Sequence, residues 1–175
     1  MNIAEVIITI NQMQVDGVIE RYAIGGAVRA TFHLEPVSTL DVDIFVIFRR
    51  EPDSLLVSLQ SIFNYLAAKG CQMEGEYAMI SGWPVQFLPS TGPLVEEALA
   101  EAITVQVGET PARVFTAEHL AAIALQVGRA KDKARLLQFI EAGVLNSDRF
   151  QTIVSRHHLG EAWQRFARQF LTDTL

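Results

Sequence analysis

The chain has 175 residues, half of them apolar, and a net charge of −6, so it can bury the core of one ordinary domain with, at most, a small helical appendage. The negative balance argues against an extended nucleic-acid-binding surface, although a local basic patch can still hold phosphates. The single cysteine, Cys71, excludes an intrachain disulfide and a thiolate metal cluster and favours a reducing compartment. The N-terminal stretch lacks a basic region and a cleavage site, and no apolar run reaches about 18 residues, so we expect a cytoplasmic protein without a signal peptide or a membrane segment.

The first two thirds of the chain alternate between predicted helices and predicted strands. The elements follow from apolar periodicity and from glycine and proline punctuation. They are a helix at 3–13, a strand at 22–24, a helix at 27–34, a strand at 41–48, a helix at 53–70, and strands at 72–80, 85–88 and 104–107. This alternation predicts an α/β (α+β) core with a mixed sheet of about four or five strands flanked by helices.

The last third is predicted to be helical throughout. Thr116 is a candidate N-cap for one long helix whose core-facing stripe recurs at steps of three and four. The stripe consists of Leu120, Ile123, Val127, Ala130, Ala134 and Leu137. Two further helices are expected around 147–158 and 161–173, and the pair His157-His158 at the end of the first is expected on the surface. We therefore predict an α/β core at 1–112 and a C-terminal helical segment at 113–175 that packs on it as a single unit.

Two aspartates lie inside an otherwise apolar predicted strand. Asp41 and Asp43 are two residues apart, so their carboxylates share one face of the strand with Phe45, whereas Val42, Ile44 and Val46 line the other face. Neighbouring anions repel each other unless a cation lies between them, and a divalent cation with oxygen ligands, Mg²⁺ or Mn²⁺, is the common solution. The alternative is a strand end in solvent with both carboxylates hydrated.

Two glycines precede these aspartates. Gly25 and Gly26 lie between a predicted strand and a predicted helix, where a glycine turn lets the backbone approach a ligand and directs free N–H groups at phosphates. Arg29, one turn into the helix, can add positive charge. The alternative is an ordinary tight turn. Taken together, the glycines and the aspartates indicate a metal–nucleotide site.

These motifs resemble those of the nucleotidyltransferase superfamily that includes DNA polymerase β. The family pattern is a hydrophobic residue with Gly-Gly or Gly-Ser, a spacer, and then Asp-hydrophobic-Asp/Glu-hydrophobic, which here corresponds to 24–26 and 41–44. The start "GGAVR" looks like the tRNA CCA-adding branch, but Ala30 stands where that branch has an acid. The stretch "STLDVDIFV" is closer to the small bacterial and archaeal nucleotidyltransferases of the AbiEii toxin type. A second similarity to that group is a helix at 119–136, in which Arg129, Lys131 and Asp132 match a basic cluster followed by Lys-Asp.

The resemblance implies a nucleotidyltransferase-like fold and activity. An NMP would pass from an NTP to the hydroxyl of an unknown acceptor, which could be RNA, a protein or a small molecule. Gly25, Gly26 and Arg29 would bind the triphosphate, Asp41 and Asp43 would hold Mg²⁺ or Mn²⁺, and Lys131 would neutralise charge. The alternative for Lys131 is a solvated helix face.

A further departure from the family pattern concerns the third carboxylate. Catalytic members generally carry a third carboxylate on a neighbouring strand, and here the corresponding residue is Gln86, whose amide adds no charge and cannot act as a base. Glu74 and Glu76 on the preceding strand either substitute for it or are exposed. The departure favours a rival interpretation, in which the chain is a catalytically degenerate module that acts by binding a nucleotide or a partner protein, for instance in a toxin–antitoxin system.

Overall fold

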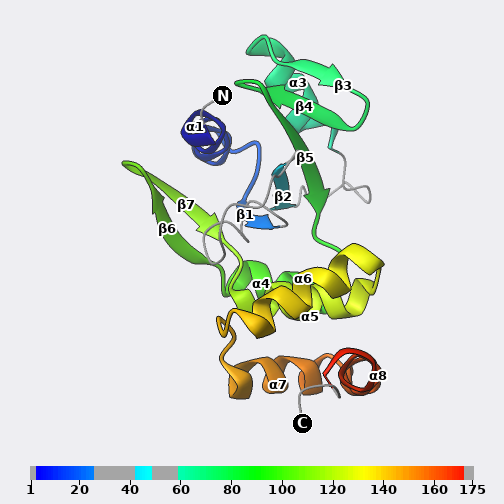
Figure 1. The fold of residues 1–175 in the computed structure, drawn as a ribbon. Coiled ribbons are helices and arrows are strands. Elements are labelled where there is room, and N and C mark those ends of the chain that lie inside the picture. Colours follow the sequence, from blue (N-terminus) through cyan, green and yellow to red (C-terminus); the bar gives the residue numbers. More distant parts are fainter. Residues whose placement is uncertain (1–2, 26–41, 49–58, 172–175) are drawn as a thin grey trace. The chain divides into compact units, whose positions relative to one another are not determined.

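A computed structural model of the chain describes residues 3–25, 42–48 and 59–171 (Figure 1). These residues form an α/β protein with a seven-stranded mixed sheet, an N-terminal helix and a C-terminal helical region. The chain divides into two compact units. We call Met1–Thr91 with Leu99–Phe115 the sheet unit, and Gly92–Ala98 with Thr116–Leu175 the helical unit.

The sheet unit contains nine of the described elements. They are α1 (Ile3–Val15), β1 (Arg21–Gly25), β2 (Val42–Ile47), α3 (Gln60–Ala68), β3 (Gln72–Glu74), β4 (Tyr77–Ile80), β5 (Trp83–Pro89), β6 (Ile103–Val107) and β7 (Thr110–Val114). The strand order is β3-β4-β5-β2-β1-β7-β6. The strands pair antiparallel, except that β2 runs parallel to β5 and β1 runs parallel to β7.

One face of this sheet carries the core. In β2 the buried residues alternate with half-buried ones, as expected for a strand whose two faces differ, so the predicted division of this strand is confirmed. The apolar stripe of α1 packs against the buried face, and α3 adds two further side chains. The stripe and the side chains that it meets include Val6, Ile7, Ile10, Met13, Val42, Ile44, Val46, Ile62 and Leu66.

The sheet has seven strands, more than the four or five predicted. The segment 72–80, predicted as one strand, is a hairpin of two strands. Gly75 adopts a φ of +65° in the turn between β3 and β4. A second hairpin turns at Gly108, where φ is +62°, and it adds β7 beside the predicted β6. We missed β7 because Pro111 and Arg113 interrupt its apolar pattern.

The helical unit is built from most of α4 (Pro93–Ala100) and from α5 (Ala117–Val127), α6 (Ala130–Glu141), α7 (Ser147–Arg156) and α8 (Gly160–Phe170). Helix α5 contacts α6, α7 and α8. The interface of α7 with α8 is aromatic, because the Phe150 and Trp163 rings meet edge to face at 5.1 Å and Trp163 stacks on Phe166 at 5.8 Å. Helix α4 was not predicted, although Pro93 occupies its first position, where proline is favourable.

The single long helix predicted after Thr116 is wrong. Gly128 adopts the left-handed conformation, with φ of +70°, and ends α5, and α6 begins after the extended Arg129. Leu120, well before the break, is buried as predicted. The break changes the direction of the apolar stripe, so Val127 is 49% exposed and Ala134 is also exposed. Thr116 is the N-cap as predicted, with its hydroxyl accepting from the His119 N–H at 3.3 Å.

Several expectations fall outside the described residues. They are the helix at 27–34, the start of the helix at 53, and the site residues Gly26, Arg29 and Asp41. One boundary between the units falls after Phe115, and Gly92–Ala98 also belongs to the helical unit, so the division into 1–112 and 113–175 stays a prediction. That the helical segment packs on the sheet as a single unit stays a prediction. In the part of the chain that the structure describes, no helix has the length and apolar content to cross a bilayer.

Candidate functional site

The sheet register brings three of the motif residues together. Gly25 on β1 pairs with Asp43 on β2, and Asp43 pairs on its other side with Gln86 on β5. Paired residues in adjacent strands point to the same face of a sheet. The Asp43 and Gln86 side chains therefore lie next to each other, both half-buried, on the face opposite the α1-covered core. Gly25 is the last residue of β1 and Asp43 the second of β2, so the group lies at one end of both strands.

The same row continues toward the edge of the sheet. Gln86 pairs with Tyr77 on β4, and Tyr77 pairs with Glu74 on β3. Glu74 is thus three strands from Asp43, about 14 Å at the usual strand spacing, which is too far to bind the same metal ion. Glu76 lies exposed in the turn between β3 and β4. Glu74 is therefore too distant to complete a ligand set with Asp43, and Gln86 is the residue that pairs with Asp43 on β5.

Gly25 has a packing role that the sequence did not reveal. A Cβ atom placed on Gly25 would lie 2.8 Å from Cδ2 of Phe45 and still nearer its Cε2, with Cε2 of Phe115 at 3.4 Å. The Phe45 and Phe115 rings contact each other at a centroid distance of 5.0 Å, so the Phe45 ring is held over the glycine. Gly25 is therefore needed because an aromatic ring covers its Cα. Whether its backbone also approaches a phosphate stays a prediction.

The three residues that match the family in the helix predicted at 119–136 have two different roles. The guanidinium of Arg129 binds the buried carboxylate of Asp132, with Nε to Oδ2 at 2.7 Å, and this pair closes the first turn of α6. Lys131, between them, is exposed. Two of the three matching residues thus have a structural function within the helical unit, and Lys131 is the one whose side chain is presented to solvent.

A charged cluster in the helical unit was not predicted. The Glu97 carboxylate, on α4, accepts hydrogen bonds from His157 Nε2 at 2.9 Å, from Arg156 at 3.0 Å and from His119 Nε2 at 3.2 Å. The side chain of His119 is fully buried. Of the pair predicted on the surface, His158 is exposed as predicted, whereas the His157 side chain is only 9% exposed. The residues come from three helices and no short motif contains them, so the sequence offered no signal for the cluster.

The geometry defines how the protons of this cluster are arranged. Because the Thr116 hydroxyl oxygen accepts from the His119 backbone N–H, its own proton can go to His119 Nδ1 at 2.8 Å, which leaves the Nε2–H to donate to Glu97. Burial alone raises the pKa of Glu97, but hydrogen bonds from His157, Arg156 and His119 outweigh it and lower the pKa to about 2. The cluster is thus a charge-assisted network that ties α4, α5 and the end of α7 together.

No protein-family model matches the chain, and no curated protein matches it. The fold and the site therefore define a class only: an α/β protein with a mixed sheet, whose β1, β2 and β5 bring a glycine, an aspartate and a glutamine side by side.

Proposed function

We propose that the chain is a nucleotidyltransferase-fold enzyme that transfers an NMP from an NTP to an acceptor hydroxyl. The observation that supports this most directly is the register that places Asp43 between Gly25 and Gln86. These residues lie far apart in the chain, yet they meet on three adjacent strands, in the order glycine, aspartate and third ligand position that the family resemblance implies.

The oxygen donors at this position fit a hard divalent cation. Asp43 supplies a carboxylate and Gln86 an amide oxygen, and Mg²⁺ or Mn²⁺ favours such ligands. In the proposed site Asp41 and Asp43 would hold this ion, which would supply positive charge to balance the triphosphate. Gly25, Gly26 and Arg29 would bind the phosphates, and the charge-neutralising role of Lys131, which lies in the helical unit, stays an expectation from the family resemblance. The acceptor hydroxyl gives up its proton to solvent as its oxygen attacks the α-phosphorus, so that the new phosphoester bond forms, the bond to pyrophosphate breaks and pyrophosphate leaves.

Gln86 supports a second candidate function. Its amide lies beside Asp43 but cannot take the proton from the acceptor hydroxyl. A chain with this substitution could keep nucleotide binding and work as a binding module in a toxin–antitoxin pair. The two candidates agree on the nucleotide and differ on whether a bond is made.

One experiment separates them. The protein is incubated with each α-labelled NTP, Mg²⁺ or Mn²⁺ and a cell extract, and the label is followed into RNA, protein and small molecules. We expect label transfer by the wild type and a rate of transfer at least tenfold lower in Asp43→Asn. Glu76→Gln, a matched change at an exposed carboxylate, should transfer the label as fast as the wild type. Nucleotide binding that depends on Asp43 but occurs without transfer would establish the binding module, and absence of both would refute the proposal.

A further inference from the structure

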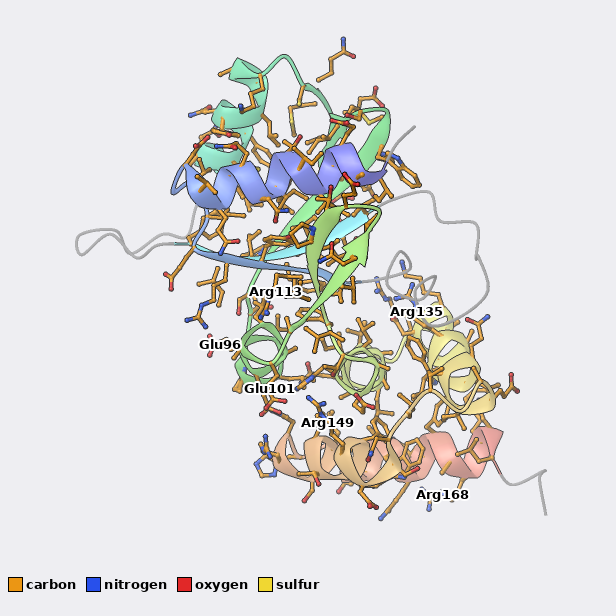
Figure 2. All side chains as sticks on the ribbon, turned by 90° about the vertical axis from the view of Figure 1, so that its left-hand side faces the viewer. Glu96, Glu101, Arg113, Arg135, Arg149 and Arg168 are labelled. Carbon is orange, nitrogen blue, oxygen red and sulfur yellow. The ribbon has the colours of Figure 1, made fainter. Side chains whose placement is uncertain are left out.

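The sheet unit contains a pocket at some distance from the Asp43 row. It has a volume of about 310 Å³ and is lined by Gln14, Arg21, Tyr22, Leu99 and Arg113. Arg21 begins β1, and Arg113 lies on β7 (Figure 2). Gly25, at the other end of β1, is four residues from Arg21, or about 13 Å along the strand. The pocket is therefore separate from the proposed catalytic site.

The pocket exists because β1 and β7 diverge. The two strands pair in register only at Ile24 and Val114. Toward the start of β1, a side chain takes the place of the backbone hydrogen bonds between the strands. The Tyr22 hydroxyl accepts a hydrogen bond from the Arg113 N–H at 3.3 Å and donates one to Asn11 at 2.6 Å. The Asn11 amide in turn donates to the Pro111 carbonyl at 2.9 Å. These bonds hold the strands apart, so the opening is a built part of the fold.

The lining of the pocket is positively charged in a protein whose net charge is −6. Arg21 and Arg113 contribute two guanidinium groups, and within the described residues neither forms an ion pair. The amide of Gln14 is held in place by donating to the Glu20 carbonyl at 2.9 Å. The pocket thus presents two positive charges and no carboxylate in its lining.

We propose that this pocket binds a phosphate dianion, either free phosphate or the phosphate of a small monoester. A phosphate monoester carries a charge between −1.5 and −2 at pH 7, which about balances two arginines. The planar guanidinium donates two parallel hydrogen bonds to phosphate oxygens, a geometry that lysine lacks. A volume near the lower end for ligand pockets suits a phosphate with one sugar-sized group and excludes a polynucleotide.

Calorimetric titration of the whole chain with ribose 5-phosphate, inorganic phosphate and malonate tests the proposal. We expect saturable one-to-one binding of a phosphate probe, at least tenfold weaker in Arg21→Gln and in Arg113→Gln, and unchanged in Arg165→Gln, a matched change at an exposed arginine of α8. Tighter binding of ribose 5-phosphate than of phosphate identifies a monoester, and equal binding identifies the free ion. Arg113→Lys keeps the charge without the planar group, and we expect it to bind between the wild type and Arg113→Gln.

Three results would overturn the proposal. They are no saturable binding of either phosphate probe, malonate bound as tightly as the phosphates, and an equal loss of affinity in Arg165→Gln. Thermal unfolding of each variant shows whether it is folded, and Arg21→Gln, at an exposed position, provides the test if Arg113→Gln does not fold. We expect Asp43→Asn to leave this binding unchanged, so failure here is distinguishable from failure of the proposed transfer activity.

Discussion

Replacing Gly25 by alanine tests the packing at the proposed site. The added Cβ would lie 2.8 Å from Cδ2 of Phe45, whereas carbon atoms favour about 3.5–4.0 Å, so the ring must move by about 1 Å. Phe115 limits this movement, since its ring contacts that of Phe45 and its own Cε2 would lie 3.4 Å from the new methyl group. Overpacking of this kind costs about 1–3 kcal/mol.

The assay is thermal and urea unfolding followed by circular dichroism. A loss of about 1–3 kcal/mol corresponds to a fall in Tm of about 2–12 °C for a chain of this size. Gly160→Ala is the matched control, because it begins α8, has no heavy atom near an added Cβ and needs no positive φ. We expect that control to be neutral or stabilised by up to about 1 kcal/mol.

A second substitution identifies the cause. If the clash with Phe45 is responsible, Phe45→Leu should relieve part of it, and the double variant should be more stable than the sum of the single changes by about 1 kcal/mol. Gly25→Ala with wild-type stability, or with no coupling to Phe45→Leu, would refute the packing argument. If Gly25 also approaches a phosphate, the double variant recovers stability but not nucleotide affinity.

Three further predictions concern the charged cluster, a helix cap and the metal. The folded pKa of Glu97, about 2, lies below its ordinary value of 4.5, so its ionised form stabilises the fold above about pH 5 and loses this effect as the pH falls toward 2. Unfolding measured across this range should therefore be less pH-dependent in Glu97→Gln, and an unchanged profile would contradict the network. Thr116→Ala should cost about 1 kcal/mol by removing the N-cap of α5, and more than Thr152→Ala at an exposed mid-helix position, as urea unfolding would show. Gln86→Asp should raise the calorimetric affinity for free Mn²⁺ by adding a third carboxylate to those of Asp41 and Asp43, and no change would mean that residues 43 and 86 do not share a ligand site.

The sequence predicted best those features that depend on local patterns of residues. The alternation of Val42, Ile44 and Val46 with more polar residues identified β2 and its two faces, and Thr116 marked the start of α5. Gln86 was expected on a strand beside Asp43, and the register confirms this pairing. Each of these features depends on residues that are close together in sequence or on the pairing of two strands.

The features that were missed depend on long-range contacts or on single backbone angles. The left-handed Gly128 splits a helix whose apolar periodicity continues across it. The ring that covers Gly25 comes from another strand, Phe45 on β2, and the Glu97 cluster joins side chains from three helices. The secondary-structure propensities of single segments do not predict such contacts, because the contacts form only when the elements pack.

Calorimetry tests most directly whether Asp43 belongs to a metal–nucleotide site. The wild type, Asp43→Asn and Glu76→Gln are titrated with Mg²⁺ alone, and then with a non-hydrolysable NTP in the presence of Mg²⁺. Because Mg²⁺ gives up its waters reluctantly, we predict weak binding of the free ion, and saturable nucleotide binding that weakens at least tenfold in Asp43→Asn and is unchanged in Glu76→Gln. Tight Mg²⁺ binding by the wild type without nucleotide, unaffected by Asp43→Asn, or nucleotide binding that does not depend on Asp43, would contradict the account.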